Sequence, residues 1–311
     1  MLLSQLSALS GMGVDVMAEI ADKSPFVRRV EFREDPTDYS YYPTDAQSQP
    51  AFRALGGSYG PDAENPTKQN GTQAFLGGEF TLDKSYKVDA EKGMLNLDLY
   101  VRRLYMQRAK SMAEGIDKQT FIGDGSSNSL EGFVTLLDGS ANVTGFSSTM
   151  VVDAAAGGGL DVTSDTKWST FLELIDNVLY DVPGANMIAC NRTLASKLST
   201  IARNRHALTY DLDEFGYRAG LFNNVPIVPL ADGAIANNEA AADAGTDTTS
   251  LYIFRWEEVN GVSLVSNNGL EFKEFDELEA SVNSKARLEL RYNIAIESPD
   301  ALRRIRYIKA Q

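Results

Sequence analysis

Residues 93–125 read GMLNLDLYVRRLYMQRAKSMAEGIDKQTFIGDG, a stretch without proline that has glycines at both ends. Its apolar residues recur in steps of three and four, which places them on one face of an α-helix. A helix of roughly 28 residues would be about 42 Å long, or about twice the usual length in globular proteins. The stretch therefore predicts one long helix on which other elements pack. Its apolar stripe consists of Met94, Leu97, Val101, Leu104, Tyr105, Met112 and Ile116.

The segment before this helix, residues 35–78, has a different composition. It holds half of the ten prolines and many glycines, and aromatic residues are interleaved among them. A disordered linker contains few aromatics, and a self-sufficient core contains few such breakers. We expect an extended excursion that buries its aromatics against something else, such as a neighbouring subunit; an irregular surface loop is the alternative. The aromatics are Tyr39, Tyr41, Tyr42, Phe52, Tyr59 and Phe75.

The remaining patterns predict a mixture of helices and strands. Residues 1–22 form a weak amphipathic pattern, expected as an arm or a short helix. A helix at 166–179, with Ser164 or Asp165 as its N-cap, and a second helix after a capping Asn191 lie among short strands. Residues 138–166 and 233–249 are expected as loops. Strands are expected at 26–33, 78–88, 185–190, 225–230, 251–254, 262–265, 270–275 and 281–296.

Composition and charge exclude several classes of protein. The formal charge of −14 argues against a protein that grips nucleic acid by its phosphates, because that needs a basic face. Cys190 is the single cysteine, so no intrachain disulfide forms. His206 is the single histidine, which excludes any site that needs two imidazoles, and we expect it to be a surface residue. No apolar run reaches the length of about 18 residues that a membrane helix needs.

No motif indicates a catalytic, cofactor-binding or metal-binding residue. Gly123-Asp124-Gly125 opens like a dinucleotide loop, but Asn128 stands where the third glycine belongs, and the run follows a helix instead of a strand. Residues 211–216 begin like a calcium loop whose later positions hold phenylalanines. The acidic run at 271–279 is expected as a solvated or interface strand face and not as a metal site. The sequence therefore predicts a protein that is not an enzyme and has no cofactor.

Four local patterns follow one another along nearly the whole chain. They are the helix end 116–125 with Glu131-Gly132-Phe133, the segment Asn191-Arg192-Thr193 leading to Leu198, the strand 224–228, and the strand 286–293 that continues to Pro299-Asp300-Ala301. In this order the chain resembles the major capsid protein family of tailed bacteriophages, whose fold is shared by encapsulin shells.

The resemblance implies an α+β fold with an extended β-hairpin loop and a long spine helix. Its implied division is an N-terminal arm at 1–33, the extended loop at 34–92, the spine helix and first part of a peripheral domain at 93–149, an axial α/β domain at 150–260, and return strands of the peripheral domain with the C-terminus at 261–311. The implied function is a subunit that self-assembles as pentamers and hexamers into an icosahedral shell around double-stranded DNA. An encapsulin-like compartment with protein cargo is one alternative, and a soluble enzyme with a long core helix is another.

The implied partners are copies of the chain itself, scaffold, portal and decoration proteins, and packaged DNA that is bound without sequence-specific contacts. No membrane is expected, and the location is the virion, assembled in the host cytoplasm. A separate scaffold protein, or none, is implied because no helical scaffold segment precedes the arm. Some family members cross-link a loop lysine to an asparagine. Lys68, Lys84 and Lys87 lie in the corresponding region, with Asn283 and Asn293 as candidates, but no motif pairs them.

Overall fold

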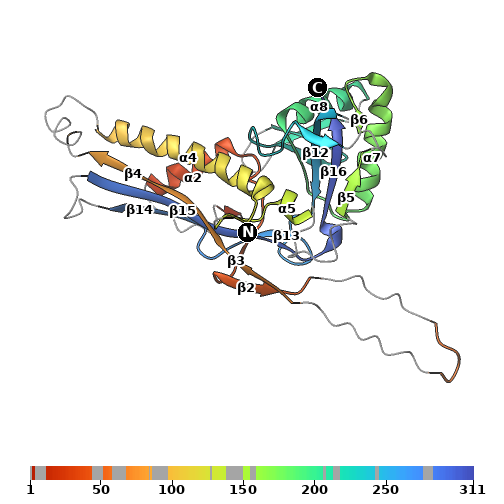
Figure 1. Ribbon diagram of the computed structural model, residues 1–311, viewed down its shortest axis with the longest axis horizontal. Coiled ribbons are helices and arrows are strands. Elements are labelled where there is room, and N and C mark those ends of the chain that lie inside the picture. The colour runs from red at the N-terminus through yellow and green to blue at the C-terminus, as the bar shows by residue number, and fades with distance from the viewer. Residues whose placement is uncertain are drawn as a thin grey trace.

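The computed structural model describes residues 2–3, 12–43, 52–57, 68–83, 85, 97–126, 128–137, 150–154, 159–205, 208–212, 218–241, 245–275 and 283–311. Within them the chain forms two sheets, a two-stranded ribbon and several helices (Figure 1). This is an α+β fold, as the sequence predicted.

Helix α4 (Leu97–Ile122) confirms the predicted long helix. On its apolar stripe Tyr105, Met112 and Ile116 are buried. Helix α2 (Met12–Lys23) lies along α4, so the amphipathic N-terminal pattern is a short helix packed on the long one (Figure 1). Ion pairs between the two helices are exposed, and such pairs add little stability compared with the buried apolar side chains.

A five-stranded sheet packs against α4 (Figure 1). Its long strand is β15. Between sheet and helix the ring of Tyr105 packs edge-on against Phe80 and Phe272, with centroids 4.9 and 5.1 Å away. One edge of β15 pairs with β13 and β14 and the other with β4, while β1 runs parallel to β13. The strands are β1 (Phe32–Glu34), β4 (Ala74–Asp83), β13 (Val262–Ser266), β14 (Leu270–Phe275) and β15 (Asn283–Ile296).

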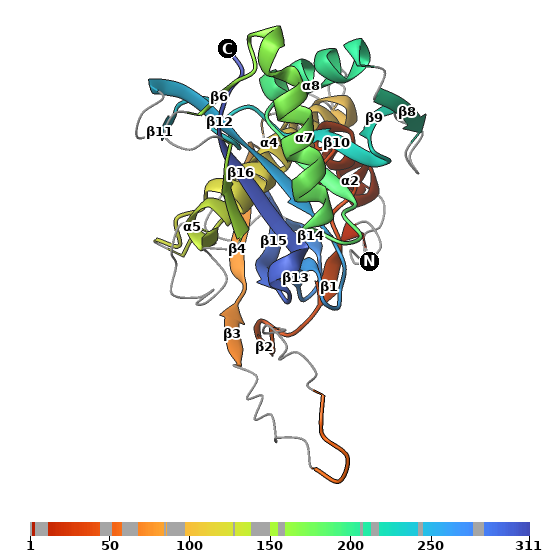
Figure 2. The same cartoon turned by 90° about the vertical axis from the view of Figure 1, so that its right-hand side faces the viewer.

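A second sheet has nine strands in the described residues, with β5-β16-β12-β7-β10-β9-β8 as its main order. Helices α7 (Trp168–Tyr180) and α8 (Arg192–Asn204) cover one face (Figure 2). Asn191 caps α8 as predicted, its Oδ1 accepting from the Leu194 N–H at 2.8 Å. The strands are β5 (Val151–Asp153), β6 (Leu160–Asp161), β7 (Met187–Cys190), β8 (Leu208–Leu212), β9 (Arg218–Phe222), β10 (Val225–Pro229), β11 (Glu239–Ala241), β12 (Gly245–Phe254) and β16 (Leu302–Lys309), with 3₁₀ turns η2 (Asp165–Lys167) and η3 (Pro299–Ala301).

Aromatic side chains join the nine-stranded sheet to the end of α4. Phe121 packs edge-on against Phe26 at 5.3 Å and Tyr252 at 5.2 Å between ring centroids. Phe133, on the short helix α5 (Phe133–Leu137), lies 5.0 Å from Phe254. Offset and edge-on ring pairs of this kind add about 0.5–1.5 kcal/mol each beyond the area they bury. One continuous core therefore runs from the long helix into the second sheet.

The strand predicted at 26–33 is mostly wrong. Residues 25–29 form a turn, and only Phe32–Glu34 pair as β1. The turn satisfies its own backbone, since the Val30 N–H donates to the Phe26 carbonyl at 3.1 Å and the Val27 N–H to Ser24 Oγ at 3.0 Å. A compact turn can bury both Phe26 and Val30. The alternation of apolar and polar residues had suggested that these two side chains lie on one face of a strand.

The two stretches expected as loops also contain strands. Within 138–166 lie β5 and β6, and within 233–249 lie β11 and the start of β12. Strands β8 and β9 had no prediction. The predicted cap is wrong as well, because Ser164 makes no capping hydrogen bond and η2 precedes α7. Strands β5, β6 and β11 have only two or three residues each, so pairing with the longer β16 or β12 supplies the stability that the local sequence lacks.

Candidate assembly interface

The extended loop begins and ends in a two-stranded ribbon. Strands β2 (Asp38–Tyr41) and β3 (Gln69–Thr72) pair antiparallel, and β3 leads through Gln73 into β4. Residues 52–57 lie beyond the ribbon, well away from both sheets in the two views (Figures 1 and 2). The base of the ribbon and residues 52–57, which we call the tip, are the two ends of the candidate interface.

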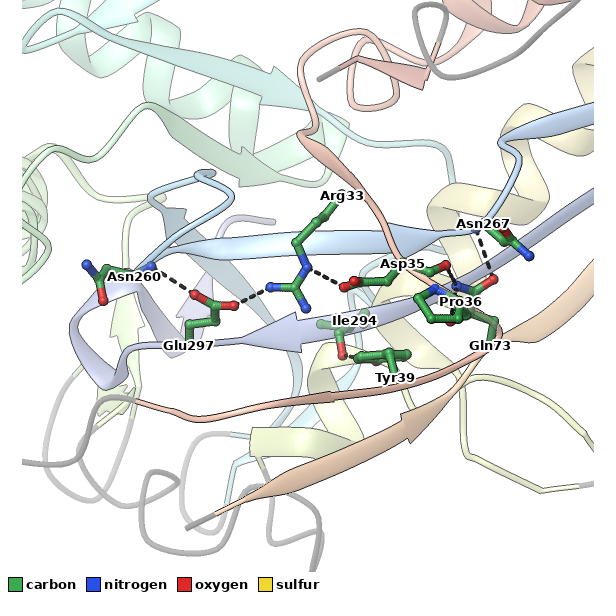
Figure 3. Close-up of polar contacts among 9 residues, drawn as sticks. All are labelled: Arg33, Asp35, Pro36, Tyr39, Gln73, Asn260, Asn267, Ile294 and Glu297. Carbon is green, nitrogen blue, oxygen red and sulfur yellow. Dashed lines mark hydrogen bonds and ion pairs between the residues drawn. The ribbon is translucent and has the colours of Figure 1, made fainter. Parts of the chain in front are cut away.

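Gln73 clamps the base (Figure 3). Its side chain is 2% exposed, and its Nε2 donates to the carbonyls of Asp35 at 2.9 Å and Pro36 at 3.1 Å. Its Oε1 accepts from the Asn267 N–H at 3.1 Å. One amide thus satisfies three backbone groups from the start of the loop and from the turn after β13, which fixes where the ribbon leaves the body.

A second chain of polar contacts lies beside it (Figure 3). Arg33 donates from Nε to the carboxylate of Asp35 at 2.6 Å and from Nη1 to Glu297. The other oxygen of Glu297 accepts from the Asn260 N–H at 3.0 Å. The three charged side chains are largely sheltered, so these charge-assisted bonds are screened less than surface pairs.

Tyr39 attaches the ribbon itself to the five-stranded sheet. Its hydroxyl donates to the Ile294 carbonyl at 3.2 Å, and the Asn293 amide donates to the Thr72 carbonyl at 2.8 Å. Burial raises the pKa of Tyr39 well above its ordinary value, so the phenol remains a donor throughout the ordinary pH range. The ring lies over Gly71, where a Cβ would approach its atoms to 2.5 Å.

The tip has the opposite character. The side chains of Phe52 and Leu55 are fully exposed. The Gly57 N–H donates to the Ala54 carbonyl at 3.0 Å with Gly56 at φ +84°, and Arg53 Nη1 donates to the Gly57 carbonyl at 2.9 Å. A positive φ at the third position is typical of a type II turn. The tip is therefore a closed turn that presents two large apolar side chains, which no residue in the described part of the subunit covers.

The aromatics of the loop thus divide. Tyr39 is covered by its own subunit, whereas Tyr42, Phe52 and Phe75 are more than half exposed. Tyr59 lies outside the described residues. The described part of the loop extends from the body as expected, whereas the burial of its aromatics against a neighbouring subunit stays a prediction. The sequence did not single out Gln73 or Leu55. Exposed apolar groups that lie on an outlying turn are a common mark of a protein–protein contact.

The structure describes only some of the other residues raised by the sequence. Lys68 is exposed, whereas Lys84, Lys87, His206 and the side chain of Asn283 lie outside the described residues. Hydrogen bonds from Ser126 and Ser129 lower the pKa of Asp124 to about 2. The same hydrogen bonds hold together the turn that follows α4. In the part of the chain that the structure describes, no group of three or more metal-ligating side chains gathers. None of the described helices is long and apolar enough to cross a membrane.

No family model and no curated protein matches the chain. Solved structures do match its fold. The SrpI encapsulin of Synechococcus elongatus PCC 7942 has a TM-score of 0.60 at 12% identity, covering 92% of this chain and 87% of that one. The capsid of an empty GTA particle has a TM-score of 0.58 at 12% identity, covering 97% and 92%. The capsid of Myoviridae phage XM1 has a TM-score of 0.54 at 12% identity, covering 88% and 86%. The chain therefore has the fold that phage capsid and encapsulin subunits share.

Proposed function

We propose that this protein is a shell-forming structural subunit, a phage major capsid protein that self-assembles into an icosahedral particle. The observation that carries the proposal is the contrast within the extended loop, whose base is pinned to the body and whose tip exposes Phe52 and Leu55. Covering a Phe or Leu side chain stabilises an association by about 1.5–3 kcal/mol each. The proposed partner is a second copy of the chain, which is supported by the likeness of this fold to subunits of encapsulin and capsid shells.

A closed shell repeats the same contact between subunits many times, so a modest contact in each copy is enough to stabilise the whole shell. Pentamers and hexamers are the proposed capsomers, and stable interfaces between subunits bury about 1,200–2,000 Å² in total. The divisions at 1–33, 34–92, 93–149, 150–260 and 261–311 remain predictions, as do scaffold, portal and decoration partners and a virion location. Enzymatic activity is not part of the proposal.

The proposed content is double-stranded DNA. The net charge of −14 supports a lining that does not hold phosphates tightly, so that DNA can move during packaging. In the encapsulin-like alternative the same shell holds a protein cargo. The likeness to the SrpI encapsulin supports this alternative as strongly as the likenesses to phage capsids support DNA. The two differ in what a purified particle contains.

The test is expression of the full chain, alone and with the other gene products of its source. We expect sedimentation to show large uniform particles and electron microscopy to show closed icosahedral shells. DNA that resists added nuclease identifies a capsid, whereas a single copurifying protein identifies a compartment. A chain that stays monomeric at every concentration and with every coexpressed partner overturns the proposal.

A further inference from the structure

A buried carboxylate joins three parts of the chain that lie far apart in sequence. Asp117 lies on α4 and is 1% exposed. Ser24 Oγ, in the segment after α2, donates to Asp117 Oδ1 at 2.6 Å. The Ala231 N–H, in the segment after β10, donates to Asp117 Oδ2 at 3.2 Å. The carboxyl group is therefore the polar contact at which the N-terminal segment and the nine-stranded sheet meet the long helix.

In the part of the chain that the structure describes, no cation forms an ion pair with this carboxylate. Arg192 lies 3.4 Å from Asp232 instead. Several charged or titratable groups lie on the elements packed around it, and Glu114, Arg192 and Tyr292 interact with it electrostatically. The groups are Arg28 and Arg29 in the segment after α2, Glu114 and Lys118 on α4, Arg192 on α8, Asp232 after β10 and Tyr292 on β15. A buried carboxylate without a cationic partner is costly in its charged form.

Burial and hydrogen bonding have opposite effects on the pKa of Asp117, and together they place it near neutral pH. Burial is the largest cause and raises the pKa of Asp117 to about 7, while the hydrogen bonds from Ser24 and Ala231 act in the opposite direction. Glu114 raises the pKa further, and Arg192 lowers it. Both protonation states are thus populated within about one unit of neutral pH.

We propose that Asp117 is a proton-operated latch, which holds the 231–233 segment on the long helix when it is protonated and releases that segment when it is charged, while the 24–27 turn stays in place through Phe26 and Val27. The surrounding aromatic cluster keeps the larger core together, so the release is local. The proposal concerns the subunit and does not depend on shell assembly.

The direction of the pH dependence follows from the linkage between proton binding and opening of the junction. In an open junction the carboxyl group meets water and its pKa returns toward the ordinary value near 3.9, whereas in the closed junction it is raised. The closed form is therefore fully favoured below the open-state pKa. That advantage is lost as pH rises through the closed-state pKa, so opening becomes easier from acid toward neutral pH.

The test is hydrogen exchange of the 230–233 backbone in the full chain, corrected for the intrinsic pH dependence of exchange. Between pH 5 and pH 8 we expect protection to fall by roughly ten- to a hundredfold in the unmodified protein. In Asp117→Asn protection should stay level, because an amide can accept from Ala231 and donate to Ser24 but cannot ionise. Asp181→Asn, an exposed position after α7, is the matched control and should behave like the unmodified protein.

Ser24→Ala supplies an independent reading should Asp117→Asn fail to fold. It removes a hydrogen bond that favours the charged form, so the midpoint of the protection loss should move to higher pH. Level protection in the unmodified protein overturns the proposal. So does an equal loss in Asp117→Asn, or an unmoved midpoint in Ser24→Ala.

Discussion

The base and the tip of the extended loop belong to one segment but are built by different physics. At the base, polar side chains satisfy backbone groups of their own subunit, and Gln73 and Tyr39 are buried. At the tip a short turn holds Phe52 and Leu55 in water. The base contributes to the stability of one subunit, whereas the tip has apolar area that stabilises nothing until another molecule covers it. Changes at the two ends should therefore have separable effects.

The largest expected effect is at the tip. In the double variant Phe52→Asp with Leu55→Asp, the concentration needed for assembly should rise at least a hundredfold, because two apolar anchors worth about 1.5–3 kcal/mol each are replaced by charges. The melting temperature of the isolated subunit should hardly change, since neither side chain is covered in it. Sedimentation velocity and thermal unfolding measure the two quantities.

Phe52→Leu with Leu55→Met is the matched control, because it keeps apolar side chains on the same turn and should still assemble. Normal shells from the aspartate variant would show that the tip is not an anchor. Unfolding of that variant at lower temperature would show that the tip serves its own subunit.

The next effect is at the base. Gln73→Ala should destabilise the subunit by about 2–4 kcal/mol, because it leaves the Asn267 N–H and the Asp35 and Pro36 carbonyls without their buried partner. Chemical denaturation of the unassembled subunit measures the change. Gln107→Ala, at an exposed position on α4, is the control and should stay within about 0.5 kcal/mol. Equal stabilities of the two variants would mean that Gln73 does not clamp the loop.

A smaller effect is expected inside the ribbon. Gly71→Ala places a methyl group within 2.5 Å of the Tyr39 ring, and the shift needed to relieve it should cost about 1–3 kcal/mol. Gly78→Ala on β4 meets no atom within 4 Å and serves as the control. Thermal unfolding of both variants gives the comparison. The idea fails if Gly71→Ala is as stable as Gly78→Ala, since the ring would then not rest on the ribbon.

The sequence predicted the elements that have strong periodic patterns. The spacing of Tyr105, Met112 and Ile116 predicted α4, and the alternation through Leu288, Leu290 and Tyr292 predicted β15. It missed β5 and β6, which pair with β16 far away in the chain, and it also missed β8 and β9, which pair with each other and, through β9, with the nearby β10. At the turn around Phe26 the apolar residues are buried on all sides, and their spacing resembles the alternation that is typical of a strand.

The candidate site was predicted only in outline. Proline and tyrosine content indicated an excursion, and Phe52 was among its aromatics, but composition cannot tell which aromatic is covered. Gln73 has no local signal, because its role depends on Asn267, almost two hundred residues later. Asp117 has none either, since a carboxylate on a helix is usually solvated and only the packing of two distant segments buries this one.

Strand β16 has a consequence for the timing of folding. It is synthesised after every other described strand, yet it pairs with β12 on one side and with β5 and β6 on the other. While residues 302–309 are still inside the ribosome, one edge of β12 is open, and β5 and β6 lack the strand with which they pair. We expect the nine-stranded sheet of a nascent chain to stay incomplete until residues 302–309 have left the ribosome, so the sheet can close only after this strand is released.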